Sequence, residues 1–125
     1  MNSRQALLLL SAICLLPIAL SYGLMPRSSL NYLFGIPVSQ INDTHIFRAV
    51  MGLSLGFSLF WCAGVFTRHL RQAALYSLVI FMLGLAAGRL LSLILDGVPN
   101  WLLLVYLGLE LGIGILGMVV LKRSD

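Results

Sequence analysis

Residues 73–95 read AALYSLVIFMLGLAAGRLLSLIL, a stretch of mostly apolar side chains that contains one charged residue, Arg89. An α-helix of about 20 mostly apolar residues is long enough to cross a hydrocarbon layer about 30 Å thick. A helix also satisfies its backbone hydrogen bonds internally, as lipid requires. We therefore expect residues 73–95 to form a transmembrane helix.

Three other stretches share this length and apolar character, over about residues 6–24, 46–66 and 101–121. The whole chain is 60% hydrophobic and 10% charged, whereas soluble domains are about 45–50% apolar and about 25% charged. The sequence predicts an all-α integral membrane protein. Residues 1–125 are expected to form a single transmembrane domain, a four-helix up-and-down bundle.

Composition and motifs disfavour several classes of function. The net charge of +4 comes from eight Lys and Arg against four Asp and Glu, with no dense basic run, so nucleic acid is not an expected partner. Cys14 and Cys62 lie in separate apolar stretches without C-x-x-C spacing, so we expect packing roles and no metal site. No zinc-protease, nucleophile-elbow or phosphate-loop motif is present, and we assign no catalytic residue and no cofactor.

Positively charged side chains indicate the orientation of the spans, because Lys and Arg are retained on the cytoplasmic side. One side of the predicted bundle carries five of them: Arg4, Arg68, Arg71, Lys122 and Arg123. Among the opposite loops, only Arg27 is a lysine or arginine. Both termini are therefore predicted to face the cytoplasm.

The first span also has features of a cleaved signal peptide. Arg4 precedes it, and Ala19-Leu20-Ser21 places small residues at a cleavage-like spacing. Its apolar run is longer than the core of about 7–15 residues that is typical of signal peptides. We therefore expect the first span to be retained in the protein.

The longest segment outside the spans, residues 25–43, mixes apolar and aromatic side chains with polar ones between Pro26 and Pro37. A short helix at the membrane surface, over about residues 28–36, is one interpretation, since aromatic side chains are at ease near lipid head groups. An irregular loop folded over the mouth of the bundle is the other.

Three charged residues, Arg48, Arg89 and Glu110, lie within the predicted spans. Each is costly there, by at least about 2.5–3.5 kcal/mol near the centre of a span. In the predicted orientation Arg48 lies in the first turn on the outer side. Arg89 lies about 10 Å inward from Asp96, and Glu110 lies about 13 Å inward from Trp101. All three charges are therefore expected in the outer half of the bundle.

Helical spacing groups further polar residues with these charges, because residues three, four or seven apart share a face. Arg89, Ser92 and Asp96 form one such stripe, and Tyr106 and Glu110 continue along one face through Gly114 and Gly117. Asn42, Asp43 and His45 precede Arg48. We predict that these faces converge on an outward-opening pocket, with the following ligand-binding residues: Arg48, Arg89, Glu110, His45, Asp43, Ser92, Asp96 and Tyr106.

The same residues also allow a purely structural interpretation, in which Arg89 and Glu110 form a buried ion pair that fixes the bundle. Two arginines then face one intramembrane carboxylate, so Asp43 or Asp96 would have to balance the second. Buried ion pairs are poor stabilisers compared with apolar packing. The structural network and the functional pocket remain alternatives that do not exclude each other.

Three pairs of glycines have G-x-x-x-G spacing: Gly52 and Gly56, Gly84 and Gly88, and Gly108 and Gly112. Small residues at this spacing let helices approach closely in lipid. We expect these pairs to pack within the bundle rather than to drive self-association. Because Arg48 shares a face with Gly52 and Gly56, we also expect Arg48 to turn towards a neighbouring helix.

Several of these segments resemble a bacterial four-helix membrane protein family of unknown function, domain-of-unknown-function family 4345. The segments are HIFRAVMG (45–52), GLAAGRLLS (84–92), DGVP (96–99) and Glu110. The run G-R-x-x-S-x-x-x-D-G-x-P is the most specific part, and the resemblance covers nearly the whole chain. It implies a multi-pass protein of the bacterial inner membrane, but no activity, substrate or cofactor.

The polar pocket favours a non-enzymatic membrane protein that binds an amphiphilic or anionic small molecule. Arginine suits a carboxylate, a phosphate head group or a quinone carbonyl, so membrane lipid is an expected partner. The alternative is an accessory or assembly subunit that docks another membrane protein or a second copy of itself. A proton relay through Glu110 and His45, or an enzyme using either as acid or base, is a weaker hypothesis, because the spans hold a single carboxylate.

Overall fold

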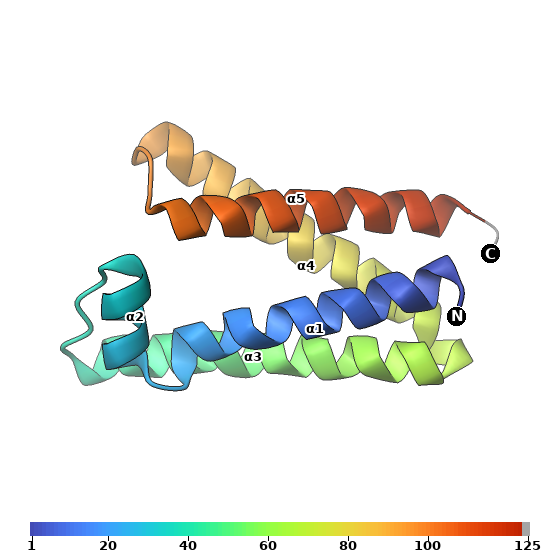
Figure 1. The fold of residues 1–125 in the computed structure, drawn as a ribbon, viewed down its shortest axis with the longest axis horizontal. Helices are drawn as coiled ribbons and strands as arrows, with labels where there is room; N and C mark the ends of the chain where they lie inside the picture. The colour runs from blue at the N-terminus through green and yellow to red at the C-terminus, as the bar shows by residue number, and fades with distance from the viewer. Residues whose placement is uncertain (124–125) are drawn as a thin grey trace.

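Five α-helices form the computed structural model, which describes residues 1–123 and contains no strand within that range (Figure 1). The helices are α1 (Ser3–Gly23), α2 (Pro26–Phe34), α3 (Ile41–Phe66), α4 (Arg68–Leu95) and α5 (Trp101–Lys122). All except α2 are long and apolar enough to cross a membrane. The predicted all-α membrane bundle with four spans is therefore confirmed. Residues 124–125 of the predicted domain lie outside the described residues.

Three of the spanning helices begin earlier than hydropathy predicts, because polar residues form their first turns. At α1, the Asn2 side chain accepts a hydrogen bond from the Gln5 backbone and the Asn2 backbone donates to the Gln5 side chain, which caps the helix. At α4, the first turns include Arg71, which donates to the carbonyls of Gly64 and Val65 at 2.9 Å each. Arg71 thereby satisfies the end of α3.

The bundle consists of two antiparallel helix pairs, α1 with α3 and α4 with α5 (Figure 1). Both termini and the α3–α4 connection lie at one end, which we call the terminal end. The α4–α5 loop and α2 lie at the other, the loop end. α3 and α4 meet at the terminal end, and Figure 1 shows α4 running obliquely away from α3 towards the loop end. The two pairs are therefore splayed at the loop end.

The apolar core fills the half of the bundle near the terminal end. Leu8, Trp61, Leu75 and Leu78 are completely buried there. The Trp61 indole N–H donates to the Ser77 hydroxyl at 3.0 Å, which joins α3 to α4. This half of the bundle is therefore filled by buried apolar side chains.

The glycines that permit close helix packing are not the predicted ones. A Cβ at Gly64 would lie 2.7 Å from Ala74 Cβ, and one at Gly114 would lie 2.5 Å from Leu83 Cδ2. By contrast, all six G-x-x-x-G glycines are exposed, and a Cβ on any of them would meet no atom within 4 Å. The prediction that these pairs pack within the bundle is wrong. In α3 the buried face runs through Ser54, Ser58 and Trp61, on the opposite side from Gly52 and Gly56.

The segment before α3 is a helix that covers the loop end of the bundle. Leu30 and Phe34 of α2 are buried in a cluster with Val38 and Tyr106. Gly35 ends α2 in the left-handed conformation, with φ of 68°, which glycine adopts without strain. Residues 26–34 therefore form a helix and not an irregular loop, whereas the position of this helix at the membrane surface stays a prediction.

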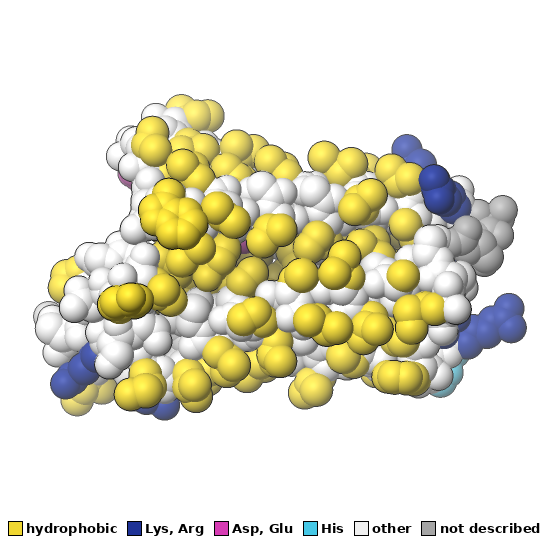
Figure 2. Space-filling model, in the orientation of Figure 1, with side chains coloured by type: hydrophobic (Ala, Val, Ile, Leu, Met, Phe, Trp, Pro, Cys, Tyr) yellow, Lys and Arg dark blue, Asp and Glu magenta, His cyan; other side chains and the backbone are white. Residues whose placement is uncertain are grey.

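The surface of the bundle suits lipid. Figure 2 shows apolar side chains spread along the visible face, with Lys and Arg side chains confined to the two ends. Many large apolar side chains are exposed along the spans, among them Leu59, Phe66 and Ile80. An apolar side surface with charged ends is what a bilayer requires of a spanning bundle.

Candidate functional site

An ion pair between α4 and α5 lies inside the splayed half of the bundle. Arg89 Nε donates to both carboxylate oxygens of Glu110, at 3.0 and 2.9 Å. The Glu110 side chain is 7% exposed and the Arg89 side chain is 23% exposed. The predicted pairing of Arg89 with Glu110 is therefore confirmed.

Tyr22 is a second partner of the arginine, and the sequence pattern did not indicate it. Arg89 Nη2 donates to the Tyr22 hydroxyl at 3.0 Å, which ties α4 to α1. The Arg89 Cζ atom also lies 5.9 Å from the centre of the Tyr106 ring, within cation–π range. Tyr22 stands near the loop end of the first span, so the depth argument applied to Arg89 and Glu110 would have identified it.

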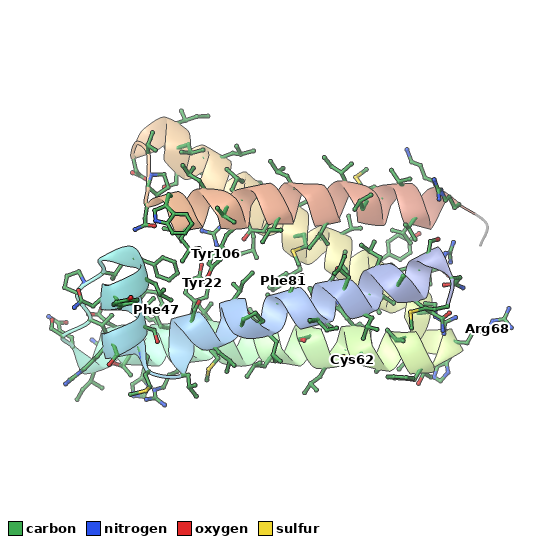
Figure 3. The ribbon with its side chains drawn as sticks, viewed as in Figure 1. Tyr22, Phe47, Cys62, Arg68, Phe81 and Tyr106 are labelled. Atoms are coloured by element: carbon green, nitrogen blue, oxygen red, sulfur yellow. The ribbon has the colours of Figure 1, made fainter. Side chains whose placement is uncertain are left out.

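Aromatic side chains hold this arrangement in place. Tyr22 stacks on Phe34 and Phe47, with ring centres 5.7 and 6.4 Å apart, and meets Tyr106 edge-on at 6.2 Å. Figure 3 shows Tyr22 and Tyr106 close together between α1 and α5. The rings come from α1, α2, α3 and α5, and Arg89 adds α4. Every helix therefore contributes to fixing the arginine.

The Arg89 guanidinium retains free hydrogen-bond donors. A guanidinium has five N–H groups arranged as a planar fork. Glu110 accepts from Nε and Tyr22 accepts from Nη2. Within residues 1–123, Nη1 and the second hydrogen of Nη2 have no partner. These N–H groups lie on the terminal edge of the guanidinium, which can donate hydrogen bonds to two oxygen atoms at once.

Arg89 and Glu110 lie on the wall of a cavity of about 430 Å³ between the two helix pairs, which we call the Arg89 cavity. This volume is within the range of about 300–1,000 Å³ that is typical of small-molecule sites. Its lining is mostly apolar and comes from all four spans, and it includes Cys14, Ile18, Val50, Met82 and Ile113. The combination of an apolar chamber with one fixed arginine suits an amphiphile.

The Arg89 cavity opens to the side of the bundle, between α3 and α4. Gly84 and Gly88 form part of its wall and are themselves exposed, as are Val50 and Leu85. The two glycines carry no side chain, and a Cβ at either would meet no atom within 4 Å, so the wall is open at these positions. In a membrane this opening faces the lipid phase.

The structure brings only some of the predicted residues together. Ser92 lines the Arg89 cavity with Arg89 and Glu110, and Tyr106 lies against the arginine. Asp96 lies beyond the cavity and accepts a hydrogen bond from Ser92 at 2.7 Å. Asp43 is in the first turn of α3 and lines neither this cavity nor the hollow described next.

Arg48 and His45 do not reach the Arg89 cavity, contrary to the predicted convergence on one pocket. They line a separate hollow of about 590 Å³ at the loop end, together with Arg27. Both residues are exposed, so the expectation that Arg48 turns towards a neighbouring helix is also wrong. The reason is that the buried face of α3 lies on the opposite side of the helix from Gly52 and Gly56.

The expected charge balance is also different. Arg89 and Glu110 form the one ion pair within residues 1–123, and neither Asp43 nor Asp96 pairs with Arg48. Arg48 does not require a protein carboxylate, because it is exposed at the end of a span where its charge can be solvated. No group of three His, Cys, Asp or Glu residues in this part of the chain is placed to hold a metal ion.

Comparison with known proteins identifies a family but no activity. The model of the family described as a domain of unknown function, DUF4345, matches residues 3–121. No curated protein and no solved structure matches the chain.

Proposed function

The chain belongs to the DUF4345 family, whose description names no activity, and we propose that it binds an amphiphilic small molecule in the Arg89 cavity. The observation that carries this proposal is a fixed arginine with free donors on the wall of an apolar chamber that opens towards lipid. A lipid or a quinone has the required chemistry, an oxygen-bearing head on an apolar tail. The protein acts as a binding protein rather than as a catalyst.

The head group is received by the free end of the Arg89 fork, which suits a carboxylate, a phosphate oxygen or a quinone carbonyl. Glu110 and Tyr22 hold the guanidinium by its other edge, so the arginine is in position before the ligand arrives. The tail lies deeper, against Met82 and Ile113. From Ser92 to Met82 the cavity extends about 15 Å along α4, enough for a substantial length of alkyl chain.

We place the protein in the bacterial inner membrane with both termini in the cytoplasm. The five Lys and Arg residues at the terminal end support this orientation. The Arg89 cavity then lies in the outer half of the membrane, and its side opening receives molecules from the outer leaflet.

Filling the cavity tests this function directly. Gly88→Phe places a ring beside Arg89, and its Cβ meets no atom within 4 Å. Native mass spectrometry of the purified wild type is expected to show a retained amphiphile. In the variant the retained fraction is expected to fall about tenfold or more, equivalent to at least about 1.4 kcal/mol of lost binding.

Gly112→Phe is the matched control, since Gly112 is equally open but lies away from the cavity lining. It is expected to retain the ligand as the wild type does. A wild type that carries no small molecule, or equal loss in both variants, would contradict the proposal.

A second candidate function, docking of another membrane protein, is supported by the exposed G-x-x-x-G faces. Gly52 and Gly56 leave a groove-like strip on α3 where another helix can approach closely. Affinity purification from native membranes in mild detergent is expected to recover a partner or a second copy that Gly52→Leu releases. A single partner-free species at native expression levels argues against this function.

A further inference from the structure

Arg27, His45 and Arg48 take no part in the Arg89 cavity, yet they line the second hollow together. Arg27 comes from the start of α2, whereas His45 and Arg48 lie one turn apart on α3. Side chains from separate segments of the chain therefore meet at one place at the loop end. We call this place the loop-end hollow.

A close contact between the end of α1 and α3 holds the segments that carry Arg27 and Arg48 next to each other. At Gly23 the end of α1 lies directly against α3, where an added Cβ would be 2.8 Å from the Phe47 carbonyl oxygen and 3.1 Å from Arg48 Cα. The chain then leaves α1 beside Arg48 and begins α2 at Pro26. Arg27 is thereby held on the same hollow as Arg48.

The loop-end hollow carries positive charge without a counter-charge. No Asp or Glu lines it, and within residues 1–123 neither Arg27 nor Arg48 makes an ion pair or a side-chain hydrogen bond to the protein. Two guanidinium groups facing one hollow repel each other and create a local positive potential. A bound anion is the simplest way to relieve that repulsion.

The other lining groups indicate which anion fits. The hydroxyl of Ser28 and the imidazole of His45 add hydrogen-bond donors beside the guanidinium groups, whereas the Thr44 hydroxyl donates to the Gln40 carbonyl at 3.4 Å. The rim is apolar, with Leu24, Met25 and Ile41 lining the hollow and exposed at 57%, 62% and 72%. Several donors for oxygen beside exposed apolar side chains match a phosphate group with acyl chains attached.

We propose that the loop-end hollow is a phosphate-binding site, separate from the Arg89 cavity, and that a phospholipid head group is its occupant. Arg27 and Arg48 grip the phosphate oxygens, and the apolar rim lies against the upper part of the acyl chains. Such a lipid would anchor α2 at the membrane surface.

The test uses the full chain in nanodiscs that contain equal amounts of phosphatidylglycerol and phosphatidylcholine. Native mass spectrometry measures how much phosphatidylglycerol remains bound to the wild type and to the Arg27→Ala/Arg48→Ala variant. We expect the affinity to fall about fivefold for one arginine and about 30-fold for both. Arg68→Ala/Lys122→Ala is the matched control, because it removes two exposed charges at the terminal end, where Figure 3 shows Arg68 projecting away from the bundle.

A second arm separates a lipid head group from free phosphate. Titration of the detergent-solubilised protein with inorganic phosphate, followed by calorimetry, is expected to give weak binding compared with the lipid. If inorganic phosphate binds tightly and both arginines are needed, the loop-end hollow is a phosphate-binding site whose ligand is a soluble anion and not a phospholipid. Lipid and phosphate binding that are unchanged in the Arg27→Ala/Arg48→Ala variant, or reduced equally in the control, overturn the proposal. Thermal unfolding of each variant confirms that the bundle is intact.

Discussion

Substituting Arg89 by methionine is expected to lower the free energy of unfolding by about 3–5 kcal/mol, because it leaves a buried carboxylate without its partner. Glu110 is 7% exposed, and both of its oxygens accept from Arg89 Nε. The same variant removes the donor to the Tyr22 hydroxyl. Reversible unfolding in mixed micelles of increasing sodium dodecyl sulfate content, followed by circular dichroism, measures the loss.

The double variant Arg89→Met/Glu110→Leu separates stability from binding. Replacing both members of a buried ion pair by apolar residues is often neutral or stabilising, so this variant is expected to unfold within about 1 kcal/mol of the wild type. It has no arginine on the wall of the Arg89 cavity and is expected to retain no amphiphile there, while any lipid bound at the loop-end hollow is unaffected.

Two results would contradict this account of Arg89. A double variant as unstable as Arg89→Met would mean that the single substitution acts through lost packing rather than through an unpaired carboxylate. A stable double variant that still retains the amphiphile would mean that Arg89 does not receive the head group. A stable double variant that has lost the amphiphile would support both the structural and the functional interpretation of the pair.

The four spans were predictable from the sequence because bilayer thickness sets a minimum apolar length, and each span meets it without help from tertiary contacts. Helix starts were less predictable. Ile41–His45 and Arg68–Gln72 are helical but polar, so hydropathy places the boundary where the apolar run begins. Capping hydrogen bonds such as those between Asn2 and Gln5 stabilise a polar first turn that hydropathy does not register.

The ion pair was predictable because Arg89 and Glu110 lie at similar depth on helices joined by a short turn. The exclusion of Arg48 was not, because depth along a span says nothing about which side of a helix faces the bundle. The face of α3 is decided by Ser54, Ser58 and Trp61, which are buried against α1 and α4. In a span that is apolar all round, hydrophobic periodicity does not distinguish that face from the lipid face.

The oblique path of α4 links the fold to the site. At the terminal end Gly64 lets α3 approach Ala74 of α4 closely. Farther along, Tyr22 and Glu110 draw Arg89 towards α1 and α5 rather than towards α3. The space left beside α3 is the Arg89 cavity. The contacts that satisfy the arginine therefore also keep the cavity open.

Gly114→Leu is expected to lower the free energy of unfolding by about 1–3 kcal/mol, the range seen when a packed core is overfilled. A Cβ at Gly114 would lie 2.5 Å from Leu83 Cδ2 and 2.8 Å from Leu83 Cγ, so the Leu83 side chain or the packing of α4 on α5 must shift. A Cβ at Gly117 would likewise lie 2.6 Å from Val79 Cγ2, and adding Gly117→Leu is expected to disrupt the α4–α5 pair. Unfolding in mixed micelles measures both effects.

Gly112→Leu supplies the matched control two residues away on the same helix. Gly112 is exposed and a Cβ there meets no atom within 4 Å, so its stability is expected to stay within about 0.5 kcal/mol of the wild type. If Gly112→Leu and Gly114→Leu destabilise the protein equally, Gly108 and Gly112 pack inside the bundle, as their G-x-x-x-G spacing alone predicts. Selective destabilisation at 114 instead leaves Gly108 and Gly112 facing outward, where they are free to meet lipid or a partner helix.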